Sequence, residues 1–380
     1  MLIRAALLTA HRAPLEVREV EIADPGPGEV RVRIAASGIC GSDLKAIDGT
    51  SPVVRRLPVV GGHESSGTVE SAGPGVTAFV PGDEVLIAMN RPCGSCRMCA
   101  RGDAHLCTGE DRLRAVMGVM PDGGTRLRAG GEEVRPYLGI GSFAEYAVVS
   151  ERALVRLPPG LPLDAMALLS CAVVTGVGAV LNTAAVEAGS SVLVAGCGGV
   201  GLNIVQGAAL AGAARIVAAD VSAAKAGAAK RFGATDQLVS ADGDGGLAER
   251  VRALVPGGVD YAFDATGAPA VLAEAFGATR QGGTTVMVGS PPPGAEAVVP
   301  AAGLFGSRRL LGCQGGDASP YSDLPRLVDL YSSGRLLLDE LISERVPLEQ
   351  VNEAVRRVRA GEATRSVVVF DAPPGGAAAH

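Results

Sequence analysis

Residues 1–90 alternate between apolar and polar positions over short stretches that glycine and proline interrupt. Clear examples are Glu29–Ile34, Gly67–Ser71 and Asp83–Ile87, and the stretch after Met1 alternates in the same way. A period of two with frequent turns is typical of strands that bury one face. This part of the chain is therefore predicted to form an antiparallel, barrel-like β domain.

The pattern changes to longer apolar runs from about Leu161. The run from Asp164 to Leu181 is helix-like, and Ser191–Ala195 is a short β-branched run suited to a buried parallel strand. Strand-like and helix-like runs then alternate as far as about Gly289, which is typical of a doubly wound α/β sheet. The fold class predicted from the pattern is therefore α/β.

The remaining stretches are less periodic. Residues 109–142 are polar and rich in glycine, so we expect a long loop with small strands there, and edge strands are expected near 298–312. A helix pattern covers Leu348–Ala360 and a terminal strand covers Ser366–Phe370. The tail from Pro373 to His380 consists mostly of small residues, so it is expected to be disordered.

Length, composition and charge narrow the class of protein. The 380 residues suit two domains, and 47% apolar residues are enough to fill their cores. A net charge of −6 with no polybasic run disfavours nucleic acid and anionic membranes as partners. No stretch approaches the length of a membrane span, and the first apolar run is too short for a signal peptide. We therefore expect a cytoplasmic protein.

Four of the eight cysteines lie within fifteen residues, in the pattern Cys93-x2-Cys96-x2-Cys99-x7-Cys107. Cys-x2-Cys spacing lets two thiolates reach one ion from a tight turn, and four sulfurs complete a tetrahedral structural zinc site. The alternatives are an iron–sulfur cluster and a disulfide loop, and a reducing cytosol disfavours the disulfides. We predict a structural-zinc lobe over residues 91–110.

Four thiolates around Zn²⁺ leave a net charge of −2 that needs compensation. Arg91, Arg97 and Arg101 lie among the ligands and are candidates to supply it, along with backbone N–H groups. The alternative is that these arginines are solvated loop residues.

A glycine-rich turn, Gly196-Cys197-Gly198-Gly199-Val200-Gly201, follows the predicted strand 191–195 and precedes a helix pattern. In this context the glycines allow a pyrophosphate to approach a helix N-terminus. Asp220 ends the next β-branched run, nineteen residues after Gly201, where a carboxylate binds ribose hydroxyls and repels a 2′-phosphate. The sequence therefore predicts NAD rather than NADP, with Lys225 as a further ribose contact or a plain surface residue.

Two more thiols and one histidine stand out: Cys40, His63 and Cys171. Taken singly, each is explained as well by packing as by chemistry, because buried cysteine behaves as a small apolar residue. Spacing alone leaves open whether these three residues share a site.

Taken together, the motifs resemble the zinc-dependent medium-chain alcohol dehydrogenases over nearly the whole chain except the tail. The matching segments are Cys40–Asp43, Gly62–Glu64, the four-cysteine lobe, the glycine-rich turn and Gly361–Ser366. Asp122–Arg126 and Gly141–Tyr146 look like the longer-loop branch, which contains the liver-type and glutathione-dependent formaldehyde dehydrogenases.

The resemblance implies a GroES-like, β-rich catalytic domain formed by residues 1–173 and 318–380. A Rossmann domain with a doubly wound parallel sheet, residues 174–317, would bind NAD. The resemblance also implies two zinc ions per chain, and a homodimer in which edge strands near 298–312 pair across a two-fold axis. A tetramer is the alternative.

For the active site, the resemblance implies a catalytic zinc held by Cys40, His63 and Cys171 with one open position. Ser42 would take the proton of the alcohol, Asp43 would orient His63, and Glu64 would lie behind the metal. Thr175 would pack on the nicotinamide and Arg365 would contact the pyrophosphate. The chain departs from many relatives at Gly41, where some carry arginine, and at Lys45, where histidine is common.

The expected activity is interconversion of an alcohol, medium-sized or aromatic and primary, with its aldehyde or ketone. By the same resemblance, its pocket would include Val53, Met89, Leu113, Tyr137, Leu138 and Ser290. One alternative is a thiol-adduct formaldehyde dehydrogenase, in which Arg112 or Arg114 would bind the carboxylate of the thiol. The other alternative is a catalytically inactive, NAD-responsive binding protein.

Overall fold

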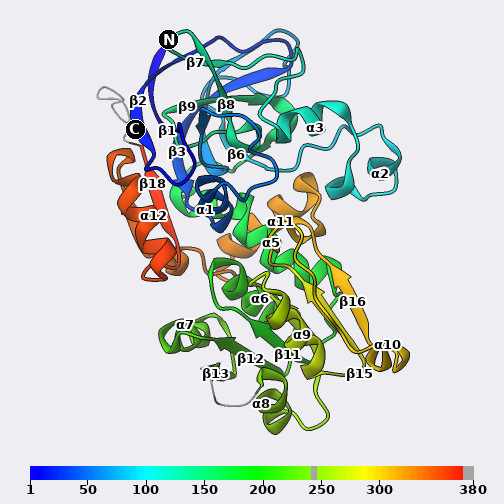
Figure 1. Cartoon of the computed structure of the whole chain (residues 1–380). Coiled ribbons are helices and arrows are strands. Elements are labelled where there is room, and N and C mark those ends of the chain that lie inside the picture. The colour runs from blue at the N-terminus through cyan, green and yellow to red at the C-terminus, as the bar shows by residue number, and fades with distance from the viewer. Residues whose placement is uncertain (241–245, 371–380) are drawn as a thin grey trace. The chain divides into compact units, whose positions relative to one another are not determined.

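The computed structural model of the chain describes residues 1–240 and 246–370 and contains two compact units. The first unit consists of Met1–Cys171, Ser319–Asp329 and the described chain from Leu338 onward, and the second of Ala172–Ala318 with Leu330–Leu337. Figure 1 traces the chain through them. The tail from Pro373 lies outside the described residues.

The first unit is mainly antiparallel, as the alternation predicts. A closed barrel is formed by β1 (Leu2–Leu8), β2 (Glu16–Ile22), β7 (Leu127–Ala129), β8 (Glu132–Pro136) and β4 (Val59–Val60). A second sheet has the order β10 (Leu154–Arg156), β6 (Glu84–Ile87), β5 (Glu64–Ala72), β3 (Glu29–Gly38), β18 (Ser366–Val369) and β17 (Glu344–Val346), with β9 (Tyr146–Ser150) also paired to β3. The strands predicted around Glu29, Gly67, Asp83 and Ser366 are confirmed.

Short helices connect these strands. They are α1 (Gly41–Asp48), α2 (Arg97–Ala100), α3 (Glu110–Val116), α4 (Leu163–Ala167), α11 (Pro320–Ser332) and α12 (Val351–Ala360). The expectation of only a loop with small strands over 109–142 is wrong at α3. Glu110 and Asp111 in its first turn and Arg114 in its last complement the helix dipole, a signal that the glycine content obscured.

The predicted helical run from Asp164 to Leu181 is broken in the structure. A 3₁₀ turn (Leu168–Ser170) follows α4, Cys171 has non-helical dihedral angles (φ −140°, ψ −77°), and α5 (Ala172–Gly178) begins next. A π-helical turn (Ala179–Thr183) then ends the segment. Within the described residues no single helix is long and apolar enough to cross a membrane, and the bent pair Leu163–Ser170 with Ala172–Thr183 matches one only by length and composition.

The second unit is the predicted parallel sheet. Its order is β13 (Asp236–Val239), β12 (Arg215–Asp220), β11 (Ser191–Ala195), β14 (Val259–Asp264), β15 (Thr279–Met287) and β16 (Arg309–Gly312). The helices of this unit are α5, α6 (Gly199–Leu210), α7 (Ala223–Ala228), α8 (Leu247–Leu254), α9 (Pro269–Ala278) and α10 (Ala301–Phe305). Numbered along the chain, the strand order is 3-2-1-4-5-6, which is the Rossmann arrangement. Val192, Leu193 and Val194 of the central strand are fully buried, which explains their continuous apolar run.

Two expected boundaries differ from the structure. Only β16 is a strand in the segment 298–312, because α10 occupies Ala301–Phe305. Leu330–Leu337 belongs to the second unit, whereas all of 318–380 was expected to belong to the catalytic domain. The reason is local: the amide of Gln206 in α6 exchanges two hydrogen bonds, of 2.7 and 3.0 Å, with the backbone of Leu337.

Candidate metal centres and dinucleotide site

Cys40, His63 and Cys171 come together in the first unit although they are far apart in sequence. Cys40 precedes α1, His63 precedes β5, and Cys171 occupies the break before α5. All three are buried, and their ligand atoms lie within 4.8 Å of one another. The two sulfurs are 4.0 Å apart, close to the roughly 3.8 Å expected from Zn–S bonds of about 2.3 Å in a tetrahedral site. This donor set fits a zinc ion.

Asp43 holds the loops of two of these ligands in place. Its Oδ1 lies 3.3 Å from Nδ1 of His63 and accepts the backbone N–H of Gly62 at 3.2 Å. Its Oδ2 accepts the backbone N–H of Cys40 at 2.9 Å. A carboxylate on Nδ1 keeps the proton there and leaves Nε2 as the ligand atom. The placement therefore agrees with the orienting role expected of Asp43.

The protonation of the three ligands is coupled. The hydrogen bond with the Cys171 thiol lowers the pKa of Cys40 well below its usual value and raises that of Cys171. Burial opposes a charge on His63, but the Asp43 carboxylate and Cys40 outweigh it and raise its pKa. The site thus favours negative charge on a sulfur, which suits a divalent cation.

Ser42 and Tyr137 stand next to the histidine ligand. The Ser42 Oγ lies 3.0 Å from His63 Nε2, and the Tyr137 hydroxyl donates to the Ser42 carbonyl oxygen at 3.0 Å. The Tyr137 ring meets the His63 ring edge-on, with 5.5 Å between centroids and 86° between planes. A hydroxyl that can exchange a proton therefore lies beside the position of the metal.

Glu64 and Arg365 form a buried ion pair near the two sulfurs. Glu64 Oε2 lies 3.4 Å from Arg365 Nη1, and the Arg365 guanidinium also donates to the Ile39 carbonyl oxygen at 3.1 Å. Gly38 makes room for this pair, because a Cβ there would lie 2.3 Å from Glu64 Oε2. The pyrophosphate contact expected of Arg365 stays a prediction. The structure shows in addition that Arg365 forms an ion pair with Glu64.

The four-cysteine lobe forms a second candidate metal centre. The four sulfurs lie within 4.8 Å of one another, with 4.0 Å between Cys93 and Cys99 and 3.9 Å between Cys96 and Cys107. These separations also fit tetrahedral zinc. All eight cysteines are free thiols, so the alternative of a disulfide loop has no support here.

Charge compensation in the lobe agrees with the expectation for the backbone N–H groups and differs from it for Arg91. Backbone N–H groups donate to the sulfurs, among them those of Cys93 and Gly109 to Cys107 at 3.2 and 3.3 Å. The buried Arg91 donates instead to the carbonyl oxygens of Leu138 and Gly139, and Arg101 pairs with Asp103. Arg91 therefore fits neither of the two alternatives left open for it, because it is buried and its guanidinium reaches into a neighbouring loop. Burial and nearby Arg112 lower the pKa of Arg91 to about 10.

The glycine-rich turn lies between β11 and α6 as predicted. Gly196 has φ +96°, and a Cβ at Gly201 would lie 1.7 Å from the Gly196 carbonyl oxygen, so both positions require glycine. The Asp220 carboxylate accepts the backbone N–H groups of Cys197 and Ser222, each at 2.8 Å. Because each carboxylate oxygen has a second lone pair, Asp220 can still bind a ribose hydroxyl.

The other predicted cofactor residues lie in neighbouring elements of the second unit. Gly198 caps α6, whose first turn contains Gly199, Val200 and Gly201. Thr175 is half-buried in α5, and Lys225 is half-buried in α7. Their contacts with a cofactor stay predictions.

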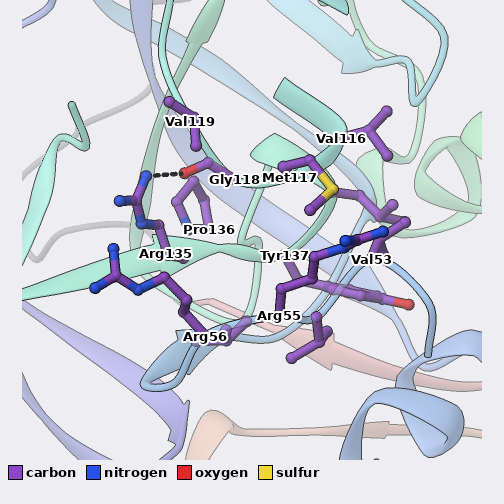
Figure 2. Close-up of a pocket in the computed structure, with 13 residues that line it drawn as sticks. Val53, Arg55, Arg56, Val116, Met117, Gly118, Val119, Arg135, Pro136 and Tyr137 are labelled. Atoms are coloured by element: carbon purple, nitrogen blue, oxygen red, sulfur yellow. Dashed lines mark hydrogen bonds between the residues drawn. The ribbon is translucent and has the colours of Figure 1, made fainter. Parts of the chain in front are cut away.

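A cavity of about 290 Å³ opens beside Tyr137 (Figure 2). Of the predicted pocket residues, Val53, Tyr137 and Leu138 line it, whereas Met89, Leu113 and Ser290 do not. Leu113 is 53% exposed. Three arginines in the lining were not predicted from the sequence: Arg55, Arg56 and Arg135. The available signal was the adjacent pair Arg55-Arg56 between the Cys40 and His63 motifs.

The two arginines suggested for binding a thiol's carboxylate are engaged elsewhere. Arg112 donates to the carbonyl oxygens of Cys107 and His105 at 3.0 and 2.8 Å. Arg114 donates to the carbonyl oxygen of Pro121 and pairs with Glu110. Both guanidinium groups therefore serve the local structure of the loop after Cys107.

Comparisons with known proteins agree with this geometry. Residues 26–159 match the alcohol dehydrogenase GroES-like domain and residues 199–333 match the zinc-binding dehydrogenase domain. The alcohol dehydrogenase class-3 of Myxine glutinosa is 37% identical over 96% of this chain and 97% of its own. The S-(hydroxymethyl)glutathione dehydrogenase of Aspergillus oryzae is 38% identical over 97% and 96%. The crystal structure of benzyl alcohol dehydrogenase from Acinetobacter calcoaceticus aligns with a TM-score of 0.91 and 30% identity, over 98% of this chain and all of that one.

Proposed function

Because this chain belongs to the zinc-dependent medium-chain alcohol dehydrogenase family, we propose that it interconverts an alcohol and its aldehyde or ketone with NAD(H). The observation that carries the proposal is the convergence of Cys40, His63 and Cys171 on one buried point, beside the Ser42 hydroxyl. Three protein ligands leave a tetrahedral metal one position for a substrate oxygen. The substrate is an alcohol of medium size or an aromatic primary alcohol, in keeping with the largely apolar cavity beside Tyr137.

Each residue of the site has a distinct task in this reaction. When bound, zinc supplies Lewis acidity toward the substrate oxygen and NAD accepts the hydride. Ser42 relays the hydroxyl proton of the alcohol: its oxygen accepts that proton while its own proton passes on to solvent, and the hydrogen bond from Tyr137 to its carbonyl oxygen fixes its backbone. Asp43 holds the proton on Nδ1 of His63. Glu64 and Arg365 place a carboxylate and a guanidinium, paired with each other, next to the sulfurs of Cys40 and Cys171.

The second unit supports the choice of NAD. A carboxylate at Asp220, at the end of β12, binds the ribose hydroxyls and repels the 2′-phosphate of NADP. Gly196, Gly198, Gly199, Val200 and Gly201 leave the helix N-terminus open to the pyrophosphate. In this proposal Thr175 packs on the nicotinamide, Lys225 contacts the ribose, and Arg365 interacts with the pyrophosphate.

We further propose two zinc ions per chain, a homodimer and a cytoplasmic location. The eight free thiols support a reducing compartment. Support for the homodimer comes from β16, which lies at the edge of its sheet, and from nearby apolar side chains: Phe305 is 95% exposed and Val298 is 84% exposed.

The decisive experiment is a panel of alcohols and aldehydes with NAD(H), with and without added thiol, followed by the absorbance of the reduced cofactor. We expect turnover of alcohols without thiol. Turnover only of hydroxymethyl thiol adducts would favour the second candidate, which the name of the Aspergillus relative suggests. No turnover by a chain that binds NAD, with one zinc rather than two, would favour an inactive binding protein.

A further inference from the structure

The hydroxyl of Ser170 connects the chain segments of two candidate ligands of the first metal centre. Its Oγ accepts the backbone N–H of Ser65 at 3.0 Å and donates to the carbonyl oxygen of Ala167 at 2.8 Å. Ser170 directly precedes Cys171, and Ser65 is the second residue after His63. One hydroxyl therefore joins two stretches of chain that are 105 positions apart in the sequence.

The direction of both hydrogen bonds follows from the chemistry of the groups. A backbone N–H can only donate and a carbonyl oxygen can only accept, so the single hydroxyl proton of Ser170 goes to Ala167 and its oxygen accepts from Ser65. Ser65 is 0% exposed and Ser170 is 3% exposed, so solvent does not compete for either bond. Removing the hydroxyl would take an acceptor away from a buried N–H, which is costly.

The position of Cys171 depends on what holds the residue before it. Cys171 lies in the break between the 3₁₀ turn that ends at Ser170 and the start of α5, and its dihedral angles are not those of a helix. Ser170 holds the end of that turn against β5, the strand that begins one residue after His63. The sulfur of Cys171 is thereby kept on the same side of the fold as the histidine ligand.

Asp43 and Ser170 have complementary tasks. The Asp43 carboxylate connects the backbone of Cys40 with the loop and ring of His63. The Ser170 hydroxyl connects the remaining ligand segment, which contains Cys171, with the strand that follows His63. Together the two side chains hold the three ligand segments relative to one another, which lowers the cost of arranging them around an ion.

We propose that Ser170 is a positioning residue of the first metal centre, whose hydroxyl keeps the sulfur of Cys171 within reach of the ion that Cys40 and His63 bind. The inference rests on the proposed function, because that function requires an ion at this centre. Ser170 touches neither the ion nor the substrate in this proposal. It acts through the backbone of Ser65 and of its own neighbour Cys171.

The test measures how fast each zinc ion leaves the full-length, zinc-loaded chain after an excess of chelator is added. We expect Ser170→Ala to release the ion of the first centre about tenfold faster than the native chain, because Cys171 is held less firmly. The ion of the four-cysteine lobe should leave at its native rate and is the internal reference. Ser170→Thr retains a hydroxyl and should restore most of the native rate.

Cadmium-113 in place of zinc distinguishes the two centres by NMR, because the chemical shift of the ion depends on how many sulfurs bind it. The first centre offers two sulfurs and a nitrogen, and the lobe offers four sulfurs. We expect the signal of the first centre to shift in Ser170→Ala and the signal of the lobe to stay in place.

Two serines of β5 provide matched controls. Ser66 is fully buried and donates to the carbonyl oxygen of Leu163, so Ser66→Ala removes a buried hydrogen bond and keeps the bond between Ser65 and Ser170. Ser65→Ala keeps the backbone N–H and removes an Oγ that has no hydrogen-bond partner among the described residues. Both variants should release the ion of the first centre at close to the native rate, whatever their melting temperatures.

Three results would overturn the inference. They are a Ser170→Ala chain that releases the ion of the first centre at the native rate, a Ser170→Ala chain that releases both ions faster by the same factor, and a Ser66→Ala chain that releases the ion of the first centre as fast as Ser170→Ala does. A native chain that holds an ion only in the four-cysteine lobe would instead overturn the proposed function on which the inference rests.

Discussion

The Glu64 carboxylate and the Arg365 guanidinium lie 3.4 Å apart, with their side chains 0% and 5% exposed. Burial opposes the charge on Arg365, but Glu64 and the sulfurs of Cys40 and Cys171 outweigh it and raise its pKa. The ion pair therefore links the first metal centre to β18, which follows Arg365 directly.

Replacing one member of this pair should leave a buried charge without its counter-charge. We expect Glu64→Gln to lower the free energy of unfolding by about 3 kcal/mol. Urea denaturation of the zinc-loaded protein would measure the change. Glu353→Gln, which removes an exposed partner of Arg356, is the matched control and should change little. A Glu64→Gln protein as stable as the native one would mean that the two thiolates suffice to balance Arg365.

The four-cysteine lobe should lose its metal as a unit. We expect Cys99→Ser to reduce the zinc content from two ions per chain to one and to lower the melting temperature, because metal binding and folding are coupled. Metal analysis together with thermal unfolding would show both effects. Cys313→Ser, a thiol outside both clusters, should keep two ions. Full zinc content and full stability in Cys99→Ser would exclude the lobe as a metal site.

The hydroxyl of Ser42 should matter for turnover and not for metal binding. We expect Ser42→Ala to lose a hundredfold or more in kcat, of the order that general acid–base catalysis contributes, while it keeps two zinc ions. Ser42→Thr retains a hydroxyl and should recover part of the rate. Steady-state kinetics with metal analysis would separate the two roles, and a nearly normal kcat in Ser42→Ala would remove Ser42 from the proton path.

The carboxylate of Asp220 should decide between the two nicotinamide cofactors. We expect Asp220→Gly combined with Val221→Arg to shift the ratio of kcat/KM toward NADP, because the double change removes a repulsive charge and adds an attractive one. Val221 is 79% exposed, so arginine fits there. Val221→Arg alone is the control. An unchanged ratio in the double variant would show that Asp220 does not contact the ribose.

The parts of the molecule that could be predicted from the sequence are those in which neighbours in the chain are neighbours in space. The four-cysteine lobe closes over fifteen residues, and the glycine-rich turn joins a strand to the helix that follows it. The spacing of the residues in the sequence therefore determines most of the geometry of the lobe and of the turn. The alternating strands of the first unit were predicted for the same reason, since a period of two records which face is buried.

The first metal centre could not be obtained in this way. Cys40, His63 and Cys171 meet only after the first unit has folded, so their spacing in the sequence does not give the distances between them in space. Only the family resemblance predicted that they share a site. The pair Glu64–Arg365 was missed because its members are separated by three hundred residues. Arg91 was a candidate partner of the nearest thiolates in sequence or a solvated loop residue, whereas its length lets it reach the carbonyl oxygens of Leu138 and Gly139.

The break in the helical run at Cys171 places this candidate ligand at the boundary between the two compact units along the chain. Cys171 is the last residue of the first segment of one compact unit, and Ala172 is the first residue of the other. The peptide bond between Cys171 and Ala172 thus joins a residue of the candidate metal centre to the start of the unit that we propose binds the nucleotide. With cobalt in place of zinc, the visible absorption spectrum of the ion would therefore report any displacement of Cys171 that coenzyme binding causes through that bond.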